Sequence, residues 1–371
     1  MAPRHGSTLE DTLRITSRSA LSGLAIVGVS TLLLAGCAPA PETPGSPDPG
    51  ASDFIPCMIS DTGGFDDKSF NQIGKQGLDE AAKELGVKAN AVESQAETDY
   101  ASNLSNLVDQ GCNIIVTVGF LLAEATKVAA EANPDVNFAI IDDSSIDLPN
   151  VKPIVFDTAQ AAFLAGYAAA SYSTSGIVGT FGGIPIPPVT IFMDGFVDGV
   201  NHYNEVKGTS VKALGWDVAA QDGAFTGGFE ANDTAKSTAQ NLIDQGADVI
   251  LPVGGPIFLS AAEAIRDSGK DIAMIGVDAD VYETAVDLKD LFLTSIMKGM
   301  QVGVSEVVKS AAAGEFDNSP FVGTLENGGV SIAPFHDYES KVDAGLQGEL
   351  DALKADIISG AVKVTSPSSP K

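Results

Sequence analysis

The residues best suited to chemistry lie in one short stretch, Asp-Thr-Gly-Gly-Phe-Asp-Asp-Lys-Ser-Phe-Asn, at positions 61–71. Phe70 offers a flat apolar face, and Asn71 beside it can both donate and accept a hydrogen bond. Asp61 adds a carboxylate acceptor. Such a set suits a site that recognises a small, flat molecule. The alternative is an ordinary turn before a helix, with two glycines for the bend and two aspartates at the helix N-terminus.

Other classes of chemistry lack their usual signals. The 3 histidines, at positions 5, 202 and 336, are too scattered for a metal site or a Ser-His pair. The chain contains no Walker-type phosphate loop and no G-x-G-x-x-G, the first signals of a nucleotide-dependent enzyme. We therefore expect no metal, no cofactor and no catalysis. An enzyme built on Rossmann-like lobes, such as a dehydrogenase, is the alternative from another class.

The charge of the chain narrows the choice of ligand. A formal net charge of −28 argues against nucleic acid, which requires clustered basic side chains. Beyond residue 36 there is one arginine, Arg266, which we expect on a solvated helix face. A guanidinium clamp on a carboxylate or phosphate is therefore not expected, which disfavours amino acids and nucleotides and favours uncharged ligands.

Residues 1–36 have the pattern of an export signal, with three arginines followed by an apolar stretch. The alternative is a transmembrane anchor, but the apolar run is short and diluted by Ser, Gly and Thr. The signal ends in Leu-Ala-Gly-Cys, which resembles the lipobox of bacterial lipoproteins, and so predicts lipidation of Cys37. Residues 37–53, rich in Pro and Gly, predict a flexible tether.

The elements that position residues 61–71 have the sequence pattern of an α/β fold. Short apolar runs alternate with helix-length segments, as in parallel α/β units, and 72–85 is an expected helix. Expected strands of a first lobe are 54–60, 89–92, 114–118 and 138–141, and those of a second lobe are 177–181, 210–214, 249–253 and 272–276.

An internal repeat relates the two lobes. Residues 106–119, Asn-Leu-Val-Asp-Gln-Gly-Cys-Asn-Ile-Ile-Val-Thr-Val-Gly, match residues 241–254, Asn-Leu-Ile-Asp-Gln-Gly-Ala-Asp-Val-Ile-Leu-Pro-Val-Gly. Each copy reads as a helix end, a glycine cap, a buried strand and a glycine at the strand tip, followed later by a strand ending in Asp142 or Asp278. The alternative is that the two segments share the common helix-Gly-strand pattern by coincidence. We interpret the match as two similar lobes whose strand tips face one cleft.

The chain continues after the second lobe is complete. A strand is expected at 291–297, a helix at 299–313, one or two short strands within 321–332 and a last helix at 340–359. These extra elements predict that the chain crosses back to the first lobe and returns, which makes a hinge.

Together these features resemble the basic membrane protein family of bacterial lipoproteins, which includes purine nucleoside receptors serving ABC importers. The stretch at 61–71 is the most specific match. Supporting motifs are Val-Gly-Phe at 118–120, Phe-Leu-Ala-Gly-Tyr-Ala-Ala at 163–169, Phe-Gly-Gly at 181–183, Asp-Gln-Gly-Ala-Asp-Val-Ile at 244–250, Gly-Val-Asp at 276–278 and Ser-Ile-Met-Lys at 295–298.

The resemblance implies a type I periplasmic-binding-protein fold, an α/β architecture with two Rossmann-like lobes joined by three crossovers. On this basis we assign 54–158 and 299–321 to the N-terminal lobe, and 159–298 and 322–360 to the C-terminal lobe. Residues 361–371 are then expected to be a disordered tail.

The family's ligand contacts transfer to matching positions of this chain. The resemblance implies that Phe70 stacks on a nucleobase, that Asn71 and Asp61 bind its edge, and that Asp278 and Lys298 bind the ribose hydroxyls. The alternatives without a role in ligand binding are a helix cap for Asp278 and a surface position for Lys298.

The second stacking ring is less certain, because the chain departs from the family pattern here. Where many relatives have Ser-Phe-Asp-Asp-Pro-Ala-Lys, residues 228–236 read Gly-Phe-Glu-Ala-Asn-Asp-Thr-Ala-Lys. Phe229 is the choice, with Phe225 in reserve and a core position as the alternative for Phe229. Further candidate site residues are Gly119, Phe120, Asp142 and Gly254.

The function implied is a monomeric lipoprotein, anchored on the extracytoplasmic face of the cell membrane. It would capture a nucleoside, with a purine base favoured, and deliver it to an ABC permease and its ATPase. A sugar or a signalling molecule bound on the same fold is the alternative.

Cys57 and Cys112 are expected to form a disulfide. Both lie in or just before strands that neighbour each other in a 2-1-3 parallel order, and an exported protein meets oxidising conditions. Two buried free thiols are the alternative.

Overall fold

The computed structural model describes residues 53–370. The expected signal at 1–36, nearly all of the tether and the candidate lipidation site Cys37 lie outside the described residues. Residues Gly50–Lys371 form one compact unit. Within the described range, no helix combines the length and apolar character that a membrane span requires.

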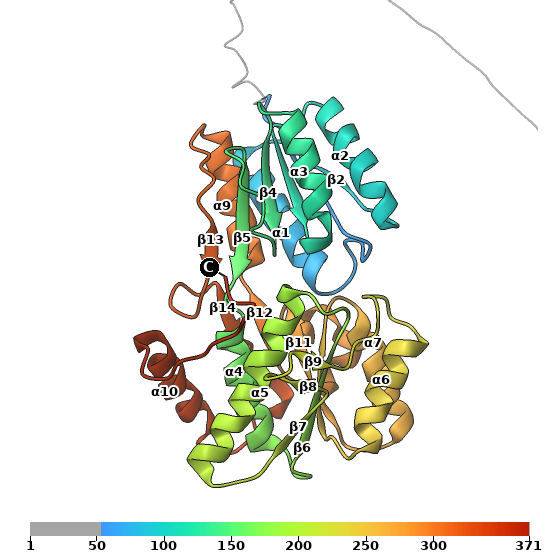
Figure 1. Cartoon of the computed structure of the whole chain (residues 1–371), viewed down its shortest axis with the longest axis vertical. Helices are drawn as coiled ribbons and strands as arrows, with labels where there is room; N and C mark the ends of the chain where they lie inside the picture. Colours follow the sequence, from blue (N-terminus) through green and yellow to red (C-terminus); the bar gives the residue numbers. More distant parts are fainter. Residues whose placement is uncertain (1–52, 371) are drawn as a thin grey trace, which may run out of the picture. The chain divides into compact units, whose positions relative to one another are not determined.

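The first of two large sheets carries the N-terminal half of the chain (Figure 1). All neighbouring strands in it run parallel. In spatial order the strands are β13 (Phe321–Gly323), β5 (Val151–Phe156), β4 (Asn137–Ile141), β3 (Ile114–Val118), β1 (Pro56–Ile59) and β2 (Asn90–Val92).

Helices cover both faces of this sheet, and the alternation of strand side chains decides which face each residue serves. Met58 and Val116 pack with α1 (Phe70–Leu85) and α9 (Met300–Ala312), whereas Cys57 packs with α2 (Tyr100–Asp109) and α3 (Ala123–Ala132). Because both faces are covered, the strands are apolar throughout rather than alternating.

The second sheet has the same strand order, apart from an added antiparallel edge. In spatial order its strands are β14 (Val330–Ile332), β12 (Phe292–Lys298), β11 (Ala273–Asp278), β10 (Val249–Val253), β6 (Ile177–Gly182) and β7 (Lys212–Leu214). Helices α6 (Asp233–Asp244) and α7 (Ile257–Ser268) cover one face, while α4 (Ala159–Tyr172) and α5 (Pro187–Lys207) cover the other.

Helix α4 is buried on nearly all sides and crosses α5 at very close range. Added Cβ atoms would lie 2.0 Å from the Phe196 carbonyl oxygen at Gly166, and 2.0 Å from the Phe163 carbonyl oxygen at Gly199. Glycine at the crossing is therefore a steric requirement, because any side chain would push the two helices apart.

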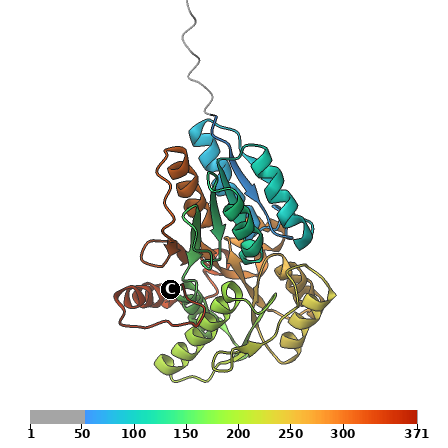
Figure 2. The same cartoon turned by 45° about the horizontal axis from the view of Figure 1, so that its top comes forward.

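The chain passes between the sheets three times: from β5 to α4, from β12 to α9 and from β13 to β14. Figures 1 and 2 both show α9 beside the first sheet and α10 (Leu346–Ser359) on the second lobe, although they are close in sequence. The remaining short elements are β8 (Trp216–Asp217), β9 (Asp222–Gly223), α8 (Val281–Thr284) and 3-10 turns at Glu97–Asp99, Phe120–Leu122, Val286–Leu291 and His336–Tyr338.

The expected strands at 114–118 and 249–253 have the observed bounds, but strand β5 was not predicted. It contains Pro153, and proline inside a run of this kind usually argues against a strand. The first helix also begins earlier than expected, at Phe70, so Phe70 and Asn71 lie on its first turn rather than in a loop.

The disulfide predicted between Cys57 and Cys112 is present, with the two Cα atoms 5.9 Å apart. Cys57 lies in β1, and Cys112 precedes β3 in the adjoining turn. The bridge therefore fixes the start of β1 against the neighbouring strand β3, on the α2 and α3 side of the sheet.

The prediction of a disordered tail at 361–371 is wrong for the described residues 361–370. The Ser366 hydroxyl donates to Asp194 Oδ2 at 2.5 Å, and the Ser369 hydroxyl donates to Asp157 Oδ1 at 2.8 Å. The serines of this segment instead supply hydroxyls for buried or half-buried partners. This segment, residues 361–370, is called the C-terminal strap below.

Candidate ligand-binding site between the lobes

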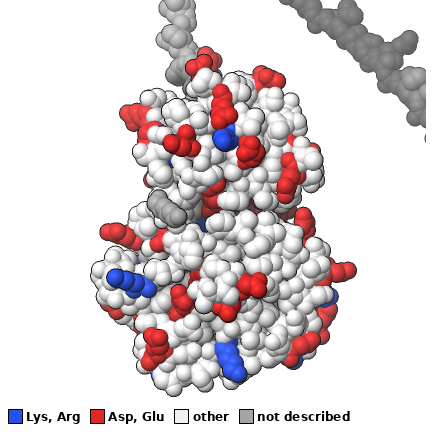
Figure 3. Space-filling model, in the orientation of Figure 1, with Lys and Arg blue, Asp and Glu red and all other residues white. Residues whose placement is uncertain are grey.

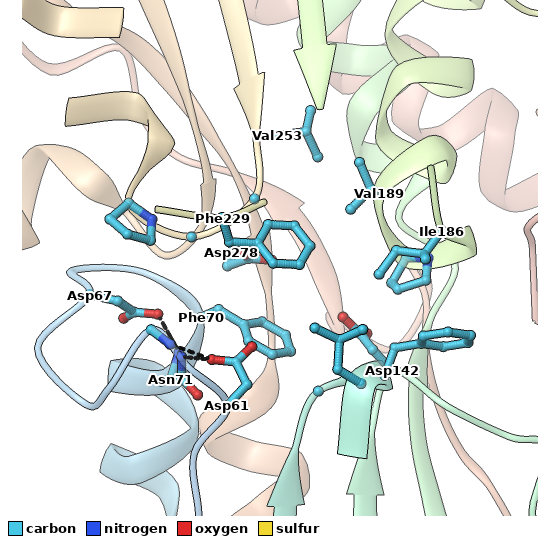
Figure 4. A pocket seen from close by; sticks show the side chains of 18 of the residues that line it. Asp61, Asp67, Phe70, Asn71, Asp142, Ile186, Val189, Phe229, Val253 and Asp278 are labelled. Atoms are coloured by element: carbon cyan, nitrogen blue, oxygen red, sulfur yellow. Dashed lines mark hydrogen bonds between the residues drawn. The ribbon is translucent and has the colours of Figure 1, made fainter. Parts of the chain in front are cut away.

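A pocket lies between the lobes, where the carboxyl ends of strands from both sheets meet (Figure 4). The structure brings all the predicted ligand-binding residues into its lining. They are Asp61, Phe70, Asn71, Gly119, Phe120, Asp142, Phe229, Gly254, Asp278 and Lys298. Their contacts with a ligand remain a prediction.

Asp67 positions Phe70, although the sequence did not single it out for the pocket. One Asp67 oxygen accepts hydrogen bonds from the backbone N–H of Ser69 (3.0 Å) and Gln72 (3.1 Å). The other accepts from Asn71 N–H at 2.8 Å. Asp67 thus satisfies the free N–H groups at the start of α1, and the helix can begin at Phe70.

Asn71 differs from its expected role at the base edge. Its Nδ2 donates to Asp61 Oδ1 at 2.7 Å and to Asp67 Oδ2 at 3.1 Å, so both amide hydrogens are engaged inside the protein. The two flanking carboxylates fix this orientation of the amide. Asn71 therefore holds Asp61 in place rather than offering a donor to a ligand.

Asp61 and Asn71 each keep a free acceptor in this corner of the pocket, because Asn71 Oδ1 is buried without a hydrogen-bond partner among the described residues. Asp61 Oδ1 is taken by Asn71 and by Gly63 N–H at 3.0 Å, but no described residue bonds to Oδ2. Burial raises the pKa of Asp61 to about 6, against the lowering effect of those two hydrogen bonds. The carboxylate is therefore ionised at neutral pH and can accept a hydrogen bond from a ligand.

Lys298 joins the two lobes at the centre of the pocket. Its Nζ lies 2.6 Å from Asp142 Oδ2, at the end of β4, and 3.4 Å from Asp278 Oδ1, at the end of β11. The lysine side chain is only 3% exposed. Burial acts to lower the pKa of Lys298, but the two aspartates together raise it, so the lysine is charged.

This cluster leaves one acceptor unsatisfied. Asp278 Oδ1 is buried and receives no hydrogen bond, because Lys298 contacts it at ion-pair distance only. Asp278 and Asp142 both have left-handed backbone conformations, with φ of 68° and 66°. Aspartate tolerates this conformation better than most residues, and it turns both carboxylates toward the same lysine.

Phe229 lies on the opposite side of the pocket from Phe70, as Figure 4 shows. Its ring lies against Gly183 and Gly254, where added Cβ atoms would come within 2.3 and 2.6 Å of the ring. The reserve candidate Phe225 packs edge-on against Trp216, with ring centroids 5.9 Å apart, and does not line the pocket. Phe229 is therefore the ring that faces Phe70.

An apolar wall from the start of α5 was missed from the sequence. It consists of Ile186, Pro188, Val189 and Phe192, and Phe192 lies 5.0 Å from Lys298 Nζ. The repeat could have found it, because this loop follows the first strand of the second lobe as 61–71 follows the first strand of the first lobe. Gly63, Leu121, Val253, Gly255 and Pro256 complete the lining.

Hydrogen bonds also join the lobes beside the pocket. The Ser69 hydroxyl donates to the Val277 carbonyl oxygen at 2.8 Å, and the Thr284 hydroxyl donates to the Lys68 carbonyl oxygen at 2.5 Å. Residues 53–370 contain no group of three or more His, Cys, Asp or Glu side chains placed to hold a metal. The site is built for enclosing a molecule between two lobes.

Comparison with known proteins decides the family. The family model described as "ABC transporter substrate-binding protein PnrA-like" matches residues 54–366. The chain belongs to this family. The resemblance to basic membrane proteins seen in the sequence is therefore confirmed.

Relatives of the PnrA-like family support this along most of the chain. The ABC transporter nucleoside-binding protein BmpA of Lactococcus lactis is 30% identical over 367 residues, covering 94% of this chain and 98% of the relative. Basic membrane protein A of Borreliella burgdorferi is 29% identical over 310 residues, covering 82% of this chain and 86% of the relative.

Solved structures agree on the fold. An ABC transporter solute-binding protein from Aeropyrum pernix K1 superposes with a TM-score of 0.75 at 26% identity, covering 85% of this chain and 94% of that one. One from Conexibacter woesei gives a TM-score of 0.64 at 21% identity, covering 85% of this chain and 100% of that one. The predicted type I periplasmic-binding-protein fold is confirmed.

Membership in the PnrA-like family fixes the class of activity. The chain is a substrate-binding protein of an ABC transporter and not an enzyme. Its partners are accordingly a transporter's permease and ATPase, and it works on the extracytoplasmic side of the membrane.

Proposed function

We propose that this protein captures a purine nucleoside between its lobes and presents it to an ABC importer. One observation carries the proposal: Asp278 Oδ1 is buried without a hydrogen bond beside the charged Lys298, in a pocket that Phe70 and Phe229 also line. A buried acceptor of this kind is costly unless a ligand donor completes it. A ribose hydroxyl is such a donor.

The rings and Asp61 suit the base. Phe70 and Phe229 offer faces on which a flat purine can stack, which contributes about 1–3 kcal/mol per ring. Asp61 Oδ2 accepts, so it matches an N–H group on the edge of the base. Aromatic faces for the base and a carboxylate with a lysine for the hydroxyls together match a nucleoside better than a sugar, which has no flat ring.

Charge argues against a nucleotide. The pocket is lined by Asp61, Asp67, Asp142 and Asp278, and Lys298, its one basic residue, is already paired. Over the face shown in Figure 3, acidic side chains are spread across both lobes and basic ones are few. A phosphate would enter a negative cleft without a free cation to pair with, so the uncharged nucleoside is favoured.

The name of the Lactococcus lactis relative, a nucleoside-binding protein, supports the same choice. We further propose that the protein is a monomer attached to the membrane by a lipid on Cys37. Mass analysis of the mature N-terminus should find cleavage after Gly36 and an acylated cysteine, and Cys37→Ala should release the protein from the membrane or leave it unprocessed.

Mass spectrometry of small molecules released from the denatured protein tests the ligand class. Calorimetry should then show tight binding of a purine nucleoside and none of galactose or ribose. Release of a sugar alone, or binding of sugars in place of nucleosides, would overturn the proposal.

The ribose contacts have their own test. Lys298→Ala and the milder Asp278→Asn should each weaken nucleoside binding about ten- to a hundredfold, while free-base binding stays almost unchanged. Asparagine suits the left-handed backbone at 278, so this variant keeps the fold. Equal losses for nucleoside and base would show that the pair does not read the ribose.

A further inference from the structure

A second cavity, of about 320 Å³, adjoins the ligand pocket. The two share four lining residues, Phe120, Asp142, Pro188 and Lys298. The Asp142–Lys298 ion pair thus forms part of the wall on both sides. This second cavity is called the side chamber.

Polar side chains line much of the side chamber. From the loop after β4 come Asp143, Ser144 and Ser145, and Thr158 lies at the first crossover. Asp143 is buried, with 4% of its surface exposed. Its Oδ2 accepts from the Ser145 N–H and hydroxyl, both at 3.0 Å, whereas no described residue bonds to Oδ1.

The C-terminal strap forms the outer wall of the side chamber through Pro367, Ser368, Ser369 and Pro370. Three serine hydroxyls fix the strap to the body of the protein. Besides the bonds of Ser366 to Asp194 and Ser369 to Asp157, Ser368 Oγ lies 2.8 Å from Thr190 Oγ1. These bonds hold the wall in a defined place, so the chamber is a built feature.

The charges of the side chamber select its occupant. Asp142 and Asp143 bring two carboxylates, and the single cation, Lys298, is held by Asp142 and Asp278. A phosphate would meet no free cation there, while an ammonium group could pair with Asp143 Oδ1. A neutral group of moderate size needs no charged partner and could occupy the chamber if it fits its volume.

We infer that the side chamber is a subsite for a neutral or cationic substituent on the ribose of the bound nucleoside. The inference rests on the proposed function, which places the ribose at Asp278 and Lys298. Lys298 and Asp142 border both spaces, so we place the 5′ carbon of the ribose at this shared border, from which an attached group would reach the chamber. The ligand class is then wider than simple nucleosides, but it still excludes 5′-phosphates.

Isothermal titration calorimetry on the mature protein, with matched ligands, tests the inference. Adenosine and guanosine are each compared with their 5′-amino-5′-deoxy and 5′-monophosphate derivatives, and adenosine also with its 5′-methylthio-5′-deoxy derivative. The amino and methylthio compounds should bind within about threefold of their parents or more tightly. The monophosphates should bind at least about a hundredfold more weakly.

Asp143→Asn separates the chamber from the pocket. It should leave the parent nucleosides unchanged and weaken the 5′-amino compounds by about tenfold relative to them. Parents that bind while both the amino and methylthio compounds lose a hundredfold or more would overturn the inference and leave the proposed function standing. If neither parent nucleoside binds, the proposed function fails and the inference fails with it.

Discussion

The two lobes repeat one another closely at the pocket. In each, a strand-tip glycine with positive φ, 116° at Gly119 and 125° at Gly254, lies beside an aromatic ring. An added Cβ at Gly119 would lie 3.4 Å from the Phe70 ring, and one at Gly254 would lie 2.6 Å from the Phe229 ring. The repeat thus keeps a strand-tip glycine beside a ring in each lobe, although Phe70 lies at the start of α1 and Phe229 in the loop before α6, and only Gly254 is sterically required by its ring.

What the lobes add to this shared frame is different. The first lobe contributes Asp61 and Asp142 to the pocket, and the second lobe contributes Asp278, Lys298 and the apolar wall at the start of α5. Both lobes therefore offer hydrogen-bonding groups to the pocket, and the apolar wall at the start of α5 belongs to the second lobe.

The lobes also gain rigidity by different means. The first is cross-linked by its disulfide, and the second is tightened by the glycine-mediated crossing of α4 and α5. Between them lies Lys298, which depends on a carboxylate from each. Perturbing each of these three features in turn shows how independent the lobes are.

Removing the shared lysine should have the largest effect on stability. Lys298→Met leaves Asp142 and Asp278 facing each other without a cation, and loss of one member of a buried pair costs about 3–5 kcal/mol. Urea denaturation measures the loss. Lys309→Met, which breaks an exposed pair with Glu84, is the control and should change stability little. Equal effects of the two variants would mean that the cluster does not hold the lobes together.

Removing the disulfide should destabilise the first lobe. Replacing Cys57 and Cys112 together by alanine releases a loop closed across a sequence separation of 55, and should cost about 2–4 kcal/mol. Hydrogen exchange should locate the loss in β1 and β3 and spare the second sheet. Uniform loss of protection across both sheets would show instead that the lobes unfold as one unit.

Crowding the helix crossing should destabilise the second lobe. Gly199→Ala places a methyl group against the Phe163 carbonyl oxygen, and overpacking of this kind costs about 1–3 kcal/mol. Gly348→Ala is the matched control: it lies in exposed α10 with open space around it, and should stabilise by up to about 1 kcal/mol. A Gly199→Ala protein as stable as the control would refute the close-packing argument.

The smallest effect concerns the acceptor of the first lobe. Because burial raises the pKa of Asp61 to about 6, its carboxylate is ionised above that pH and protonated below it. Only the ionised form accepts a ligand N–H through Oδ2, so nucleoside affinity should be constant above pH 6 and fall by up to about tenfold per unit below it. Asp61→Asn should bind more weakly and lose this pH dependence. A wild-type profile that is flat from pH 7.5 to 5 would contradict the assignment.

Sequence reasoning located the site well because its residues follow strand ends. Gly119, Gly254 and Asp142 were placed by the repeat, and Asp278 by the family resemblance, and all four follow strands whose carboxyl ends converge. Contacts that depend on side-chain geometry were beyond its reach. No sequence pattern shows that Asn71 donates both amide hydrogens to neighbouring aspartates, or that Asp67 caps α1.

Two fold features were missed for similar reasons. Strand β5 was missed because Pro153 lowers the local strand propensity. In the structure, β4 and β13 pair with this segment on both sides. The strap was expected to be disordered because it follows the last assigned element of the second lobe, and the partners that hold it, Asp194 and Asp157, are distant in sequence.

The position of the strap has a practical consequence for how the protein is handled. Its last described residues line a chamber that adjoins the ligand site, so an affinity tag or fluorescent protein fused to the C-terminus would lie close to that chamber. Such a fusion would strain the three serine hydrogen bonds that hold the strap and would change the space beside Lys298. A biosensor built on this protein should therefore carry its reporter elsewhere, for example at exposed Val128 on α3.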